Sequence, residues 1–322
     1  MNKIRRSLVV ILLVVILLVV ITRIIFTYCV YQRADMHTDM SVSSPKFNPE
    51  TSPRVLFDSG HGNFHDIKTT YAPFAMLLKN DGIVLRRHEG LFTENTLRDI
   101  ELLIIANATP IGDTEGESSG AFTESEINVL RNWIQNGGSL LLIADHDPFG
   151  SAAAGLAKAF GVGMSSAWTV DTLRFSEVIG KTTWLEFSEE NKGLGRHNIL
   201  QSENPESAVR RVITFTGQSL SFDSTWTSIL QLSPYARNYY SRSKAKVAAS
   251  DTTTYFPVPG QSQLIAREYG NGRIVIAGEA AMFTAQEVRI FFKSYHAGFN
   301  YKGYDNKNLV LNIVRWLLHE IA

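Results

Sequence analysis

Segments typical of β-strands alternate with segments typical of α-helices from residue 54 to residue 161, and this alternation constrains the fold more than any other feature. Four apolar or β-type runs predict strands at residues 54–58, 83–89, 101–108 and 139–145. Helical apolar spacing or capping signals predict helices at residues 69–82, 93–99, 123–138 and 151–161. A β-α-β-α order predicts a parallel, doubly wound sheet, and the continuous apolar runs suit strands buried on both faces.

The best-marked helix begins after Thr123. Glu126 follows three residues later, which is the spacing of a capping box, and Gly137-Gly138 supplies a stop signal.

The second half of the chain departs from this rhythm and then returns to it. Residues 163–261 contain short β-type runs separated by polar loops, which predicts a β-rich insertion that covers one edge or face of the sheet. Residues 262–280 predict a hairpin of two strands joined at Gly270-Asn271-Gly272. Residues 305–322 predict a closing amphipathic helix.

The N-terminus carries a long apolar run. Residues 8–21 contain only Leu, Val and Ile, and apolar character resumes up to residue 31. A helix over residues 8–31 is about 36 Å long, which exceeds the roughly 30 Å hydrocarbon core of a bilayer. Residues 1–31 are therefore predicted to be a cytoplasmic tail and a single transmembrane anchor, and residues 32–53 an unstructured tether to a domain at residues 54–322.

The orientation of the anchor follows from its flanking charges. Lys3, Arg5 and Arg6 precede the run, so the positive-inside rule places the N-terminus in the cytoplasm and the C-terminal domain outside the cell membrane. A cleaved signal peptide is the alternative. No small-x-small cleavage site lies near residues 28–34, which favours an uncleaved anchor.

The overall composition excludes several classes of protein. A hydrophobic content of 44% excludes a mainly disordered chain. The 31 basic residues equal the 31 acidic ones, which argues against nucleic acid as a partner, because such binding needs a basic excess. The single cysteine, Cys29, excludes an intrachain disulfide framework and a multi-cysteine zinc site.

Three loops follow predicted strands directly, at residues 58–63, 145–150 and 278–283. Parallel strands end at one edge of a sheet, where ligands of α/β proteins bind, so side chains of these loops are expected to gather there. The candidate catalytic residues of this rim cluster are Asp58, His61, Asp145, His146, Asp147 and Glu279. Carboxylates and imidazoles suit acid/base chemistry or a divalent metal. The structural alternative is that the carboxylates cap helices and that His146 bonds only to the backbone.

Four stretches carry a resemblance to a known family. They are VLFDSGHGN, GGSLLLIADHDPFGSAAAGLAKAFGV, GNGRIVIAGEAAMFTAQ and NLVLNIVRWL. They resemble the class I glutamine amidotransferase-like superfamily, and within it a membrane-associated bacterial branch related to gliding-type transporter accessory domains and trehalose-utilisation-type domains. The resemblance covers residues 54–163 and 263–322, and it implies a flavodoxin-like sheet.

The active amidotransferases of that superfamily carry a nucleophilic cysteine on a sharp strand-to-helix turn, with a histidine and a glutamate after a later strand. The matching turn here, residues 144–150, has no cysteine, and the later loop has Glu279 without a histidine. Glutamine hydrolysis through a thioester is therefore excluded, because no thiolate can form at the site.

The leading functional hypothesis is a membrane-anchored extracytoplasmic domain that binds a ligand or partner protein, with carbohydrate or cell-envelope material as the expected class by analogy. One alternative is a hydrolase that uses the rim cluster, with or without a metal. Another is an accessory subunit of a membrane transporter complex. The sequence identifies neither a cofactor nor a metal.

Overall fold

The computed structural model describes residues 11–23, 30–110, 120–176, 181–201, 206–240, 255–290 and 293–321. Its centre is a mixed sheet whose parallel strands lie in the order β3 (Leu85–His88), β2 (Val55–Asp58), β4 (Leu102–Ala106), β5 (Ser139–Ile143) and β16 (Gly272–Ala277). Numbered along the chain, these five strands have the order 2-1-3-4-5, which is that of flavodoxin-like folds. The predicted parallel sheet is confirmed.

Antiparallel strands extend this sheet beyond β16. The predicted hairpin pairs β15 (Ser262–Tyr269) with β16, and its last pair is Tyr269 with Gly272. The insertion adds three further strands: β11 (Leu220–Ser221), β12 (Thr227–Gln231) and β6 (Gly163–Met164).

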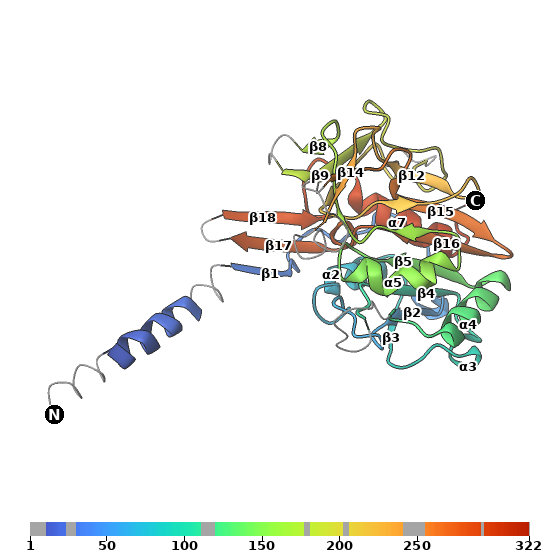
Figure 1. Ribbon diagram of the computed structural model, residues 1–322. Coiled ribbons are helices and arrows are strands. Elements are labelled where there is room, and N and C mark those ends of the chain that lie inside the picture. Colours follow the sequence, from blue (N-terminus) through green and yellow to red (C-terminus); the bar gives the residue numbers. More distant parts are fainter. Residues whose placement is uncertain are drawn as a thin grey trace.

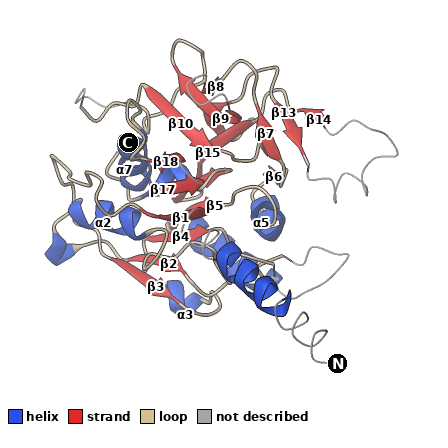
Figure 2. Ribbon diagram, turned by 90° about the vertical axis from the view of Figure 1, so that its left-hand side faces the viewer, coloured by secondary structure: helices blue, strands red, loops and turns tan. Residues whose placement is uncertain are grey.

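Helices cover both faces of the sheet, as Figure 2 shows for α2 and α5. On one face, α2 (Ala72–Asn80) and α7 (Asn306–Leu317) pack into a common core through side chains such as Leu77 and Ile313. On the other face lie α3 (Glu94–Leu97), α4 (Glu124–Gln135) and α5 (Phe149–Lys158). The sheet is therefore doubly wound. All five residues of β4 are buried, which explains its uninterrupted apolar sequence.

The rest of the insertion forms two small antiparallel sheets, so the expectation of a β-rich segment is met. One sheet contains β10 (Arg211–Phe215), β9 (Lys181–Ser188) and β8 (Phe175–Ser176). The other contains β14 (Tyr255–Pro257), β13 (Arg237–Tyr239) and β7 (Trp168–Val170).

A fourth sheet, not predicted from the sequence, contains β1 (Val30–Ala34), β17 (Ala285–Ile290) and β18 (Lys293–Gly298). The prediction of an unstructured tether over residues 32–53 is wrong, because β1 pairs with the edge of β17 and Met40 is buried in the core. A short 3-10 helix, η1 (Pro49–Thr51), follows. The segment is also held at Asp81, which accepts the Lys46 N–H at 2.9 Å and binds Arg315 of α7.

Residues 11–23 are helical, and the side chains of Ile11 to Ile21 are 42–60% exposed. They belong to the predicted transmembrane segment, residues 8–31, of which residues 8–10 and 24–29 lie outside the described residues. Its predicted end at residue 31 is wrong, because Val30 and Tyr31 belong to β1 and pair with β17. Among the residues that the structure describes, no helix has the length and apolarity needed to cross a bilayer, so the predicted transmembrane helix is not supported by the structure.

Candidate functional site

The three predicted loops do follow strands that end at one edge of the parallel sheet. Asp58 is the last residue of β2, Asp145 follows β5 by two residues, and Glu279 follows β16 by two. We call this edge the rim. Its side chains separate into two groups with different surroundings, so the predicted cluster of six residues is not one constellation.

The first group centres on His61. Its Nδ1 lies 2.9 Å from Asp58 Oδ1, and its Nε2 lies 2.9 Å from Glu126 Oε1. Phe92 and Phe122 contact the imidazole, each with a centroid separation of 4.8 Å. The imidazole therefore occupies a buried slot with a carboxylate at each nitrogen.

These surroundings favour a charged imidazolium. Burial lowers the pKa of His61, but the hydrogen bonds and charges of Asp58 and Glu126 outweigh it, and the net pKa is raised. The side chain is only 3% exposed, and both ring nitrogens are occupied by protein partners. This arrangement links the loop after β2 to α4, and it leaves the imidazole no free nitrogen for a substrate.

Glu126 was predicted only as a capping residue. In the structure it caps α4 and also contacts His61. Its Oε2 accepts the Thr123 N–H at 3.0 Å, which completes the predicted capping box, while Oε1 faces His61 and accepts the Phe92 N–H. No local signal could have revealed the second role, since His61 lies 65 residues away in the chain.

The second group contains Asp145 and Glu279. They lie at equivalent positions two residues after adjacent parallel strands, because Ile143 of β5 pairs with Ala277 of β16. Glu279 is fully buried and accepts the N–H groups of Ala281 and Met282, each at 2.8 Å. The Asp145 side chain is 16% exposed and so gives the pair a face to solvent.

The two carboxylates hold a proton more tightly than free carboxylates do. Burial raises the pKa of Asp145, and the charge of Glu279 raises it further. Burial raises the pKa of Glu279 to about 7, against the opposing effect of its backbone N–H donors. The pair can therefore carry one proton near neutral pH, as paired carboxylates do in acid/base sites.

Two aromatic side chains, Tyr71 and His65, pack together near this pair. Burial raises the pKa of Tyr71, and the charges of Glu279 and Asp145 add to it; its hydroxyl donates to the Ala280 carbonyl at 2.6 Å. His65 packs on the Tyr71 ring at 4.4 Å, and burial lowers its pKa to about 3. His65 is therefore neutral at physiological pH.

The turn after β5 is fixed by two residues that sequence reasoning missed. Asn107, which follows β4, accepts the Asp145 N–H at 2.9 Å. Gln218 of the insertion donates to the carbonyls of Ala144 and Asp145 at 2.8 and 2.9 Å. The insertion thus holds the turn after β5, a contact that no sequence pattern indicates.

His146 and Asp147 complete the second group. His146 Nε2 lies 4.0 Å from Asp145 Oδ1, its Nδ1 bonds to the Asp147 carbonyl, and burial lowers its pKa. Its ring contacts Trp168 edge-on at 5.4 Å. Asp147 accepts a hydrogen bond from Ser151 of α5. Within the described parts of the chain, no three His, Cys, Asp or Glu side chains are arranged to hold a metal ion.

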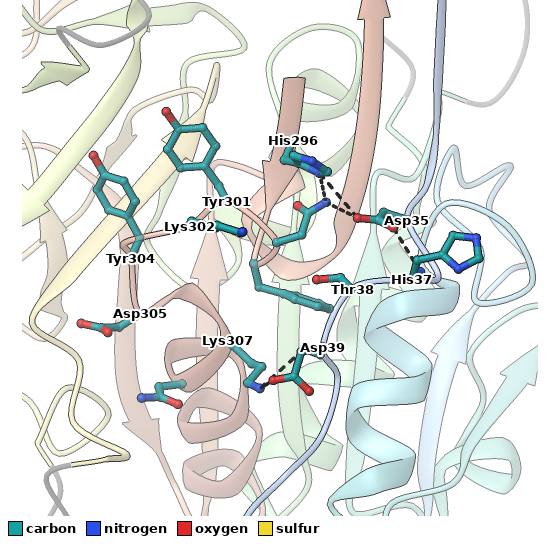
Figure 3. A pocket seen from close by; sticks show the side chains of 13 residues that line it. Asp35, His37, Thr38, Asp39, His296, Tyr301, Lys302, Tyr304, Asp305 and Lys307 are labelled. Carbon is teal, nitrogen blue, oxygen red and sulfur yellow. Dashed lines mark hydrogen bonds and ion pairs between the residues drawn. The ribbon is translucent and has the colours of Figure 1, made fainter. Parts of the chain in front are cut away.

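A polar cavity of about 500 Å³ lies apart from these two groups, between the segment after β1, the end of β18 and the first turn of α7 (Figure 3). Asn300 links Asp35 and His296 across it, at 3.0 Å to each. Lys307 bonds to Asp39 at 2.9 Å. The sequence did not predict this cavity, because one wall belongs to the segment expected to be a tether.

Comparison with known proteins adds information on the fold alone. No family model and no curated protein matches the chain. A solved structure described as the mmIFT52 N-terminal domain is 14% identical, with a TM-score of 0.56 over 82% of this chain and 96% of that one, so the two share a fold.

Two further similar structures have lower scores. A ThuA-like protein from Parabacteroides merdae is 11% identical, with a TM-score of 0.40 over 84% of this chain and 91% of that one. A protein from Thermoplasma acidophilum described as a GMP synthase subunit is 9% identical, with a TM-score of 0.41 over 82% of this chain and 96% of that one.

Proposed function

We propose that the chain is a membrane-anchored extracytoplasmic binding domain of amidotransferase-like fold, without amidotransferase activity. Its ligand is a carbohydrate or other envelope material that reaches the rim at Asp145. The single observation that carries this proposal is that both ring nitrogens of His61 are occupied by carboxylates of the protein. His61 is held between two carboxylates and two phenylalanine rings, and the turn at Asp145 offers no thiol.

Membrane attachment is supported by the N-terminal sequence and its exposure. Helical residues 11–23 expose their apolar side chains to a degree that water does not favour. Basic residues precede the apolar run and support a cytoplasmic N-terminus.

Cysteine labelling in intact cells tests the topology. On a Cys29→Ser background, Glu190→Cys places a thiol at an exposed position of the domain, and Ser7→Cys places one before the apolar run. A membrane-impermeant maleimide should label the Glu190→Cys chain in intact cells, and the Ser7→Cys chain only after permeabilisation. The reverse pattern would contradict the proposed orientation.

Thermal unfolding of the full chain in detergent tests ligand binding. A ligand that binds only the folded state raises stability, by about 2.7 kcal/mol at a concentration of 100 times Kd. Soluble envelope oligosaccharides should raise the unfolding temperature of the wild-type chain and of the exposed control Glu190→Gln. They should raise it less for Asp145→Asn. An equal rise in all three would place the binding site elsewhere.

A hydrolase is the second candidate, and the Asp145–Glu279 pair favours it. A glutamate whose pKa is about 7 beside a second carboxylate suits general acid catalysis. Chromogenic glycosides and esters should then be turned over by the wild-type chain with a pH profile that changes near 7, and Glu279→Gln should remove the activity. No turnover of any of these substrates by the wild-type chain would contradict the hydrolase.

A further inference from the structure

The strand register places the exit of the N-terminal segment beside the end of the β17–β18 hairpin. Val30 is the first residue of β1, and it pairs with Ile290, the last residue of β17. Ile290 also pairs with Lys293, the first residue of β18. Directly paired residues lie about 5 Å apart. The two residues between Ile290 and Lys293, Phe291 and Phe292, lie outside the described residues.

The β17–β18 hairpin extends beyond the rim, on the side of the domain where the N-terminal segment leaves it. Glu279 of the rim leads through η2 (Ala281–Phe283) into β17 at Ala285. From Ala285 to Ile290 the strand advances about 17 Å at the usual rise per residue. Figure 1 shows β17 and β18 extending from the body of the domain on the side where helical residues 11–23 lie. Both the apolar segment and the hairpin end are thus on the rim side of the sheet.

The charge of this small sheet is predominantly positive. Its described strands carry the basic residues Arg33, Arg289 and Lys293. Their one carboxylate, Glu287, is bound by Arg33 at 2.8 Å and accepts a hydrogen bond from the Tyr31 hydroxyl. Lys293 is exposed, and Tyr31 is of the residue type that gathers at membrane interfaces.

Such an end complements a surface of anionic lipid. Basic side chains are attracted to it when they lie within a Debye length, roughly 10 Å at 0.1 M salt. Since Ile290 pairs with both Val30 and Lys293, we expect Lys293 to lie within that range of the bilayer when the preceding segment is anchored.

We propose that the shared end of β1, β17 and β18 is a second membrane contact, which binds the headgroups of anionic lipids in the leaflet from which the anchor emerges. The inference rests on the proposed anchoring. This second contact orients the rim toward the bilayer and holds it about 17 Å from the lipid surface, which is the length of β17. The ligand of the rim is then one that is held at the membrane surface.

Depth-dependent fluorescence quenching tests this contact. The full chain with Cys29→Ser is reconstituted in phosphatidylcholine vesicles that contain phosphatidylglycerol, and a fluorophore is attached at Ser294→Cys, an exposed position next to Lys293. The matched control is Asn271→Cys, in the exposed turn before β16, at the opposite edge of the sheet. A nitroxide on the lipid headgroup should quench the label at position 294 several-fold more than the label at position 271.

Two further arms separate this contact from simple tethering. Lys293→Glu should reduce quenching at position 294, whereas Lys158→Glu, at the exposed end of α5, should not. Omission of phosphatidylglycerol should have the same effect as Lys293→Glu. Equal quenching at positions 294 and 271, in a chain that floats with the vesicles, overturns the membrane contact and leaves the anchoring intact. A chain that does not float overturns both.

Discussion

The carboxylate pair at the rim predicts an unusual dependence of stability on pH. The pKa of Glu279 is about 7, against 4.5 for an ordinary glutamate. Each pKa unit corresponds to 1.36 kcal/mol. The folded state therefore loses about 3 kcal/mol relative to the unfolded state when Glu279 ionises.

The sign follows from the raised pKa. Below about pH 4.5 Glu279 is protonated in both states, and its contribution to stability is fully present. As the pH rises from 4.5 through 7, the unfolded state releases its proton first, and this contribution is lost. Asp145 acts in the same direction, since burial and the charge of Glu279 also raise its pKa.

Glu279→Gln removes the ionisable group while nearly keeping its shape. The amide has one carbonyl oxygen for the N–H groups of Ala281 and Met282, so we expect a pH-independent loss of about 1–3 kcal/mol. Beyond this constant loss, the stability of the variant relative to the wild type should increase by about 2.5 kcal/mol between pH 5 and pH 8.5.

Urea unfolding of the full chain in mild detergent at pH 5, 7 and 8.5 measures this difference. Glu190→Gln, at an exposed position, is the control and should follow the wild type at every pH. If Glu279→Gln and the wild type keep a constant difference across this range, the pKa of Glu279 is not raised in the folded state, and the argument from its burial is refuted.

Three further predictions concern the surroundings of single residues. His61→Ala leaves Asp58 and Glu126 as buried carboxylates without their shared partner, and it should cost about 3–5 kcal/mol in urea unfolding at pH 7, whereas a loss below about 1 kcal/mol would contradict the closed arrangement. The pKa of His65 is about 3, against 6.5 for an ordinary histidine, so its NMR signals should not titrate between pH 8 and 4.5. The stability that neutral His65 contributes should be lost as the pH falls from 6.5 toward 3. Titration near 6.5 would show that it is not buried. Thr123→Ala should cost about 1 kcal/mol by removing the cap of α4, while Thr123→Ser should cost less, and equal losses would exclude the hydroxyl as the source.

The candidate site was only partly predictable from the sequence. The loops after β2, β5 and β16 were expected at one edge because parallel strands end together, and they do. That the His61 side chain turns toward α4 depends on Glu126, which lies 65 residues away in the chain. A pattern of nearby residues contains no information about such partners.

The sequence by itself determined the strands and helices of the parallel core, since continuous apolar runs, the Thr123 cap and glycine stops are local signals. It also excluded a thiol at the turn after β5. Only the tertiary structure decided that residues 30–34 complete a sheet with β17, that His61 is closed between carboxylates, and that burial raises the pKa values of Asp145 and Glu279. These features arise from burial and from contacts between distant segments, which set both the pairing of an edge strand and the charge of a carboxylate.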